Sequence, residues 1–207
     1  MRDFAVIGLT GPTGSGKSTF SEFLKKQGCA VIDADALARQ ATASETACVQ
    51  LLAGAFGEDI KTPGGGIDRA LLAGRAFADR ESTALLNRIV HPWVFLQTLA
   101  QINRYRRENR RLIVFDAPVL FESNADVLCD LVVSVIAPAE VRIQRIMERD
   151  GLTRQQALQR LSAQQPESYY RRQSDVVIDG TEEYMHLERA AVQVVASLRK
   201  KLGGVYG

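Results

Sequence analysis

The chain has 207 residues, 46% hydrophobic and 24% charged, which is ordinary for a globular protein and excludes a disordered or fibrous chain. Its 26 lysines and arginines nearly balance 24 aspartates and glutamates, so the net charge of +2 favours neither nucleic acid nor an anionic membrane as partner. No apolar run is long enough to span a bilayer, and no signal-peptide pattern is present, so we expect a cytoplasmic protein. Cys29, Cys48 and Cys129 lack CxxC spacing and are predicted to be reduced thiols.

Five short apolar runs, rich in β-branched residues, predict strands that are buried on both faces of a parallel sheet. In chain order they are Phe4–Leu9, Ala30–Ile32, Leu112–Phe115, Leu131–Ile136 and Val176–Ile178. Helical patterns separate these runs, and such alternation indicates an α/β fold built from βαβ units.

The helical patterns differ in length. A helix of about three turns, stopped by Gly28, joins the first two strands. The segment from about 36 to 111 is longer than one crossover requires, so we expect an inserted helical subdomain, in which Asp68 caps a helix. The segment 138–166 carries Thr153 and Gln156 at the spacing of a capping box. A last helix, at about Leu187–Leu202, is expected to pack against the sheet.

A glycine-rich loop lies between the first predicted strand and the first predicted helix. It reads Gly11-Pro12-Thr13-Gly14-Ser15-Gly16-Lys17-Ser18 and fits the pattern G-x-x-x-x-G-K-[ST]. Glycines let backbone N–H groups converge on one centre, while the helix N-terminus and Lys17 add positive charge. Ser18 would offer its hydroxyl to Mg²⁺. The loop, with Thr19 following it, therefore predicts binding of a nucleoside triphosphate; the alternative is a glycine-rich turn that only starts a helix.

Aspartates follow two of the predicted strands. Asp33 and Asp35 come after the second strand, at the sheet edge where α/β proteins bind ligands. One of them could accept the proton of an attacking hydroxyl. Capping of the next helix is the alternative, and it is stronger for Asp35 than for Asp33. Asp116 follows Leu112–Phe115 in the manner of a Walker B carboxylate, and we expect it to hold Mg²⁺ directly or through water.

Three arginines share one face of the helix predicted after the fourth strand. Arg142, Arg145 and Arg149 are spaced by three and four residues. A solvated basic face is one reading of this stripe. The other is a lid that brings arginines onto the transferring phosphoryl group and excludes water.

Further blocks follow the glycine-rich loop in a specific order. They are Asp33-Ala34-Asp35-Ala36-Leu37-Ala38-Arg39, Ile89-Val90-His91-Pro92-Trp93-Val94, Asp116-Ala117-Pro118-Val119-Leu120-Phe121-Glu122, Gln144–Asp150, Arg160–Gln164 and Ser174–Ile178. Over nearly its whole length the chain resembles the dephospho-coenzyme A kinases. The resemblance implies transfer of the ATP γ-phosphoryl to the ribose 3′-hydroxyl of dephospho-CoA, with Mg²⁺ and without nucleic acid or membrane as partner.

The resemblance also implies an architecture. It is a three-layer P-loop kinase fold of the α/β class, with a five-stranded parallel sheet. The nucleotide-binding core would comprise 1–35, 112–137 and 167–207; residues 36–111 would form a helical acceptor subdomain, and 138–166 a helical lid. The oligomeric state is not determined by these patterns.

By the same resemblance, individual residues receive roles. Asp33 would be the general base, Lys17 and Ser18 would hold phosphate and Mg²⁺, and Arg145 and Arg149 would contact the nucleotide from the lid. The residues implied on the acceptor side are Asp35, Arg39, His91, Leu120, Phe121 and Glu122. For His91 a structural alternative stays open, because a His-Pro pair can also begin a helix.

Two departures from the family pattern matter. Gly180 stands where the family usually has asparagine, so base selectivity would rest on backbone groups or be looser, and Ser174 replaces the usual alanine; Ala117 and Val119 are apolar replacements of similar size. Two other functions remain open: a kinase for another nucleotide or nucleoside, and a nucleotide-dependent switch. The long insertion, the arginine stripe and the lack of an Asn-Lys-x-Asp guanine motif argue against the switch, whereas competing acceptors in one assay would separate the two kinases.

Overall fold

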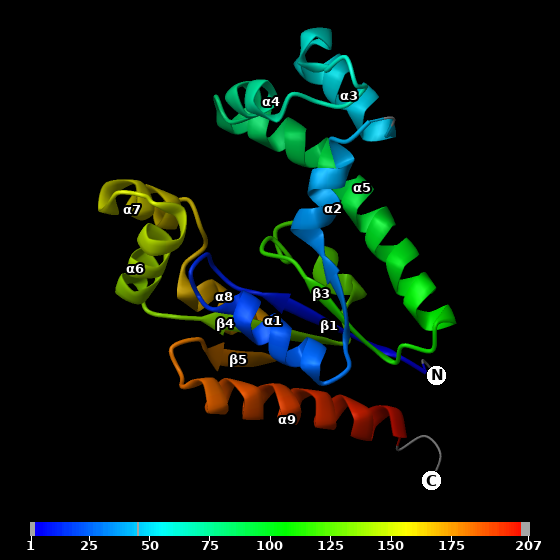
Figure 1. The fold of residues 1–207 in the computed structure, drawn as a ribbon, viewed down its shortest axis with the longest axis vertical. Helices are drawn as coiled ribbons and strands as arrows, with labels where there is room; N and C mark the ends of the chain where they lie inside the picture. The colour runs from blue at the N-terminus through cyan, green and yellow to red at the C-terminus, as the bar shows by residue number, and fades with distance from the viewer. Residues whose placement is uncertain (1–2, 45, 204–207) are drawn as a thin grey trace. The chain divides into compact units, whose positions relative to one another are not determined.

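The computed structural model describes residues 3–44 and 46–203, and its chain divides into two compact units. Within this range the first unit comprises residues 3–32 and 102–203, and the second comprises residues 33–101. Figure 1 shows the sheet and its covering helices, and the helices of the second unit, whose colours run from blue through cyan to green.

The five predicted strands are confirmed as one sheet in the order β2-β3-β1-β4-β5. Their bounds are β1 Ala5–Thr10, β2 Ala30–Asp33, β3 Leu112–Asp116, β4 Leu131–Ile136 and β5 Val176–Asp179. β1 runs parallel to β3 and β4, and β4 runs parallel to β5. Every residue of β1 is buried, as a near-continuous apolar run predicts for a central strand.

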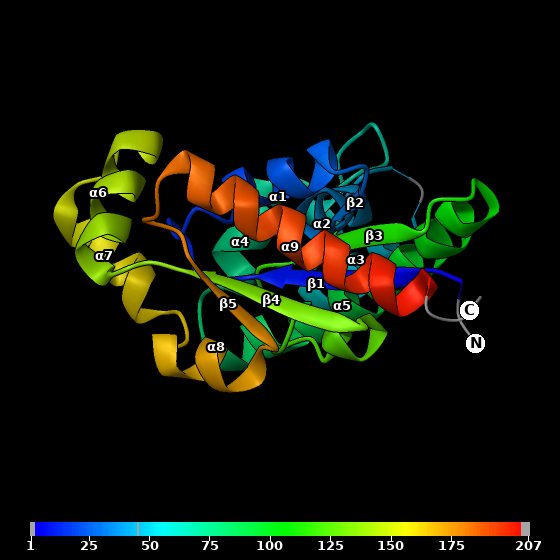
Figure 2. The same cartoon turned by 90° about the horizontal axis from the view of Figure 1, so that it is seen from below.

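Helices α1 (Lys17–Lys26) and α9 (Tyr184–Gly203) pack together and form the main core with the sheet. Phe20, Phe23 and Leu24 of α1 are almost completely buried there, together with Leu198 of α9. Figure 2 shows α9 running along this face of the sheet, beside α1. The predicted packing of the last helix is therefore confirmed.

Three further helices of the first unit follow β4 in the chain. They are α6 (Ala139–Asp150), α7 (Arg154–Ser162) and α8 (Glu167–Gln173); a short 3-10 helix, η2 (Ala125–Leu128), precedes β4. α6 and α7 form a hairpin around Ile143, Ile146 and Ala157, past the carboxyl ends of β4 and β5 (Figures 1 and 2). The predicted capping box at Thr153 and Gln156 is confirmed at the start of α7.

The second unit is helical and has its own core. Its elements are α2 (Ala34–Ala41), α3 (Ala47–Phe56), η1 (Glu58–Ile60), α4 (Arg69–Ala76) and the beginning of α5 (Arg80–Arg107). Leu52, Ala53 and Ile60 are buried at the centre of this core, with Trp93 packed against it. Asp68 caps α4 as predicted, because its carboxylate accepts from the N–H groups of Ala70 and Leu71.

The interpretation of His91-Pro92 as a helix start is wrong. Pro92 lies inside the 28-residue helix α5, twelve residues after its first residue. Proline has no N–H to donate to the carbonyl one turn earlier, so this helix lacks one hydrogen bond there. The helix is retained because its apolar residues, including Ile89 and Trp93, pack against the core of the second unit.

The three cysteines are free thiols, as predicted. Burial raises the pKa of Cys29 to about 11 and that of Cys129 to about 12, so both thiols stay protonated at neutral pH. Across the described residues, no helix combines the length and the apolar character needed to cross a membrane.

Candidate phosphoryl-transfer site

The glycine-rich loop joins β1 to α1 and leaves the beginning of α1 open. Gly14 and Gly16 have φ angles of 78° and 98°, the left-handed region that glycine adopts without strain. Gly16 is the N-cap residue of α1 and has no side chain to accept from the helix. The N–H groups of the first turn of a helix have no partner within it. The junction therefore offers a positive set of donors, which suits a phosphate group.

Ser15 adds a polar atom to this loop. Its side chain is 1% exposed, and its Oγ has no hydrogen-bond partner among the described residues. Burying a hydroxyl without a partner is unfavourable. A ligand oxygen bound in the loop would satisfy it, which agrees with the prediction that Ser15 belongs to the nucleotide site.

Lys17 and Asp116 are brought together as an ion pair. Lys17 begins α1, and Asp116 ends β3 in register with Leu9 of β1. Both side chains are largely buried, with 16% and 14% of their surfaces exposed. The sheet thus places the predicted Walker B carboxylate beside the loop lysine. Ser18 and Thr19 are exposed at the start of α1.

Asp33 ends β2 and caps α2. Its Oδ1 accepts from the N–H of Ala36 at 2.9 Å, and its Oδ2 lies 3.8 Å from a guanidinium nitrogen of Arg39. The expectation that Asp35 is the stronger candidate for the cap is wrong: the chain turns into the helix at Ala34, so Asp35 already lies in the first turn. The cap fixes one oxygen of Asp33 and leaves the other on the exposed side.

The three arginines of α6 all contact the glycine-rich loop. Arg142 Nε donates to the Thr13 carbonyl at 2.9 Å. Arg145 donates to the carbonyls of Gly14 at 3.2 Å and Gly180 at 2.9 Å. Arg149 lies 3.5 Å from Thr13 Oγ1 and pairs with Asp150. The arginine stripe is therefore directed onto the loop, and the reading as a solvated face is wrong.

Arg149 has an acidic partner, Asp150, whereas Arg142 is buried, and the pKa values of these groups are shifted accordingly. Hydrogen bonds and charge from Arg149, with a further contribution from Arg160, lower the pKa of Asp150 to about 2. The same carboxylate raises the pKa of Arg149. Desolvation lowers the pKa of Arg142, which is 7% exposed, yet as an arginine it remains charged at neutral pH.

Gly180 has a packing role that the sequence pattern did not reveal. A Cβ built at this position would collide with the Ser15 carbonyl oxygen and lie 2.9 Å from a methyl group of Val135. The turn after β5 therefore lies directly against the loop, and only glycine fits without movement. The Gly180 carbonyl also accepts from Arg145, so this turn and the arginine meet at the same place.

The residues expected on the acceptor side fall in both units. In the second unit, Asp35 and Arg39 are exposed, and His91 is partly buried, which lowers the pKa of its imidazole. At neutral pH His91 is consequently uncharged. In the first unit, desolvation raises the pKa of Glu122, although its side chain as a whole is exposed.

The expectation that Leu120 contacts the acceptor is not supported by its position. Leu120 is completely buried, and a Cβ at Gly8 would lie 2.8 Å from its methyl group. Phe121 is 8% exposed and packs edge-to-face on Tyr169. Both side chains serve the core beneath the turn that carries Glu122.

Sequence reasoning also missed Gln164, which follows α7. Its Oε1 accepts from the Thr13 N–H at 3.2 Å and from Arg142 Nη2 at 2.6 Å. The only signal was its place in the block Arg160–Gln164, because a glutamine after a helix carries no chemistry of its own.

Comparisons with known proteins show the family to which the chain is similar. The family model described as Dephospho-CoA kinase matches residues 5–185. A Dephospho-CoA kinase of Corynebacterium glutamicum is 38% identical over 198 residues, covering 95% of this chain and 98% of the relative.

Two solved structures have the same fold. One, described as TT1252 from Thermus thermophilus, is 35% identical with a TM-score of 0.80 and covers 95% of this chain and 99% of its own. The other, a dephospho-CoA kinase from Campylobacter jejuni, is 26% identical with a TM-score of 0.70 and covers 97% and 99%.

Proposed function

The chain belongs to the dephospho-CoA kinase family, and from this premise we propose how its residues transfer the ATP γ-phosphoryl to the ribose 3′-hydroxyl of dephospho-CoA. The observation that carries the proposal is the open junction between β1 and α1, flanked by the Lys17–Asp116 pair and by the arginines of α6. ATP is the co-substrate. This reaction is the last step of coenzyme A synthesis.

The phosphates would bind at the start of α1, in the loop of residues 11–18 and with Thr19. The first-turn N–H groups, which no side chain caps, and the buried Ser15 hydroxyl suit phosphate oxygens. Lys17 would exchange its contact with Asp116 for phosphate. Arg145 and Arg149, already at the loop, would neutralise charge on the transferring group.

Mg²⁺ fits the donor set of this site. Ser18 and Asp116 supply oxygen ligands, and nucleotide-bound Mg²⁺ needs only one or two protein ligands because phosphates and water complete its shell. This agrees with the described residues, in which no cluster of three or more His, Cys, Asp or Glu forms a metal cage. When bound, the ion would neutralise charge on the outer phosphates.

Asp33 would act as the general base toward the ribose hydroxyl. Its Oδ1 is fixed by the cap on α2, so Oδ2 is the oxygen that can accept a proton. Its Oδ2 has only a long contact, 3.8 Å, with a guanidinium nitrogen of Arg39. In this proposal the cap orients the base.

The acceptor would be recognised by exposed polar side chains. Asp35 and Arg39 in α2 and Glu122 after β3 are exposed, and His91 offers an uncharged imidazole for hydrogen bonding. Phe121 would act by supporting the turn that presents Glu122. Residues 36–111, most of which lie in the second compact unit, would supply the acceptor subdomain, and 138–166 the lid.

The proposal is tested by mass spectrometry of a reaction that contains the purified protein, Mg²⁺, ATP and dephospho-CoA. Coenzyme A is expected with the unmodified protein. Lys17→Ala serves as the matched blank, because it keeps the fold of the loop and removes its charge. ATP consumption without coenzyme A would overturn the acceptor assignment and direct the search to other nucleotides. ATP hydrolysis that is equally fast without any acceptor would favour a switch.

A further inference from the structure

The tip of the glycine-rich loop is held by two residues outside it, and we infer that Gln164 and Arg142 are positioning residues for the bound nucleotide. The inference deepens the proposed function, because it concerns how the same loop is oriented. It starts from Thr13, whose two backbone polar groups both have partners outside the loop.

Gln164 and Arg142 form a closed set of hydrogen bonds with Thr13. Gln164 Oε1 accepts from the Thr13 N–H at 3.2 Å and from Arg142 Nη2 at 2.6 Å. Arg142 Nε donates in turn to the Thr13 carbonyl at 2.9 Å. Each of the three residues contacts the other two, so the orientation of the Thr13 backbone is determined by both side chains.

The direction of one N–H group follows from this arrangement. In a planar trans peptide the N–H points opposite to the carbonyl of the preceding residue. Arg142 holds the Thr13 carbonyl, so the Gly14 N–H points away from α6. The N–H groups of Thr13 and Ser15 are engaged, with Gln164 and with the Pro12 carbonyl at 3.2 Å. Among the residues at the tip of the loop, it is therefore Gly14 whose backbone N–H is directed toward a bound phosphate.

Packing distinguishes Arg142 from the other two arginines. It is 7% exposed, and a Cβ at Gly14 would lie 2.9 Å from the Arg142 carbonyl oxygen, so the backbone of α6 touches the loop there. Arg145 and Arg149 lie further along α6 and are more exposed. We therefore assign Arg142 to holding the loop, while Arg145 and Arg149 are left to meet the nucleotide.

The experiment measures the dissociation constant of a fluorescent ADP analogue and the KM values of both substrates. Gln164→Leu removes the acceptor at nearly constant size, and Arg142→Met removes the donors. Gln159→Leu, an exposed glutamine in α7, is the matched control. Because Arg142→Met could fail to fold, Arg142→Lys is made as well; it keeps a charge but cannot reproduce the two guanidinium contacts.

We expect Gln164→Leu and the Arg142 variants each to weaken ADP binding and raise the ATP KM about tenfold, with the dephospho-CoA KM changed less than twofold. The double variant should be no weaker than the weaker single variant, since the pair acts as one unit. ADP binding within twofold of the unmodified protein in Gln164→Leu would overturn the inference. So would multiplicative effects in the double variant, or an equal rise in both KM values.

ADP binding needs no acceptor, so this test is separate from the proposed reaction. If the unmodified protein makes no coenzyme A, the proposed function fails, and the ADP measurements still decide the role of Gln164.

Discussion

Two strand-to-helix junctions of the sheet hold the residues proposed to bind phosphate and to act as base, and their helices begin in opposite ways. After β1 the chain enters α1 through Gly16, which gives the helix no side-chain cap. After β2 it enters α2 through Asp33, whose carboxylate caps the helix. At the first junction the N–H groups can bind an external anion. At the second junction the Asp33 carboxylate is itself the anion that accepts from the helix.

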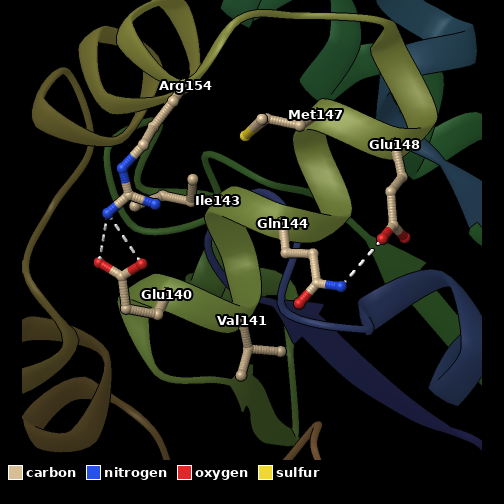
Figure 3. A pocket seen from close by; sticks show the side chains of 7 residues that line it. All are labelled: Glu140, Val141, Ile143, Gln144, Met147, Glu148 and Arg154. Carbon is tan, nitrogen blue, oxygen red and sulfur yellow. Dashed lines mark hydrogen bonds and ion pairs between the residues drawn. The ribbon is translucent and has the colours of Figure 1, made fainter.

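In the proposed mechanism, this difference suits the first junction to binding phosphate and the second to presenting a base. An uncapped helix start costs stability until a ligand satisfies its donors, so it is suited to phosphate. A capped start is complete without a ligand, and its carboxylate is held in a fixed orientation. A third helix, α6, also begins without a side-chain cap, and Glu140 in its first turn pairs through both oxygens with Arg154 (Figure 3).

The hollow in Figure 3 is not a competing site. Its lining comes only from the hairpin of α6 and α7, and the described polar groups there already pair with one another, as Gln144 does with Glu148. The face of α6 that carries Arg142 and Arg145 is the one directed to the loop.

The largest expected effect separates the two roles of Asp33. Asparagine caps helices about as well as aspartate, but it cannot take a proton. Asp33→Asn should therefore lower kcat by about 10²–10⁴-fold. The ATP KM and the melting temperature should stay nearly unchanged. Steady-state kinetics with both substrates checks this, and a kcat within tenfold of the unmodified protein would remove Asp33 as the base.

The second prediction places a negative charge at the open junction. Gly16→Asp puts a carboxylate beside the first-turn N–H groups, at a φ of 98° that disfavours any side chain. Nucleotide binding should fall by about 10²-fold or more, because the new charge competes with phosphate and repels it. Gly16→Ala, which has the strain without the charge, is the control. Equal losses in both variants, measured by titration with ADP, would show that backbone strain alone is responsible.

The sheet and the phosphate loop could be predicted because both are encoded by local patterns. Apolar runs specify buried strands, and the glycine-lysine spacing specifies the loop whatever the rest of the chain does. The role of Gly180 could not be predicted, because its collision partner, Ser15, is 165 residues away in sequence.

The wrong predictions have related causes. Whether Asp33 or Asp35 caps α2 depends on the residue at which the chain turns into the helix, and the sequence pattern does not reveal that residue. Pro92 indicated a helix start, but tertiary packing of α5 outweighed the local preference. The role of Gln164 could not be predicted, because it depends on a hydrogen bond from the backbone of Thr13, which is distant in sequence.

A third prediction concerns the turn that packs against the open junction. Gly180→Ala forces the turn after β5 away from Ser15, because the colliding atom is backbone and cannot rotate aside. Overpacking of this kind costs about 1–3 kcal/mol. The ATP KM should rise by about tenfold, since Arg145 loses its carbonyl partner as the loop shifts. Gly74→Ala in α4, where a Cβ meets nothing within 4 Å, is the matched control, and isothermal titration with ADP gives the comparison.

The smallest effect tests whether the capped junction is complete without a ligand. Asp33→Ala removes both the base and the cap, so it should be as inactive as Asp33→Asn. In addition it should lower the free energy of unfolding by about 1 kcal/mol, a shift of about 2–4 °C in melting temperature for a domain of this size. Thermal unfolding of the two variants without nucleotide isolates the cap, because neither has a base. If Asp33→Ala melted at the temperature of Asp33→Asn, the hydrogen bond to Ala36 would contribute nothing, and the contrast between the two junctions would rest on α1 alone.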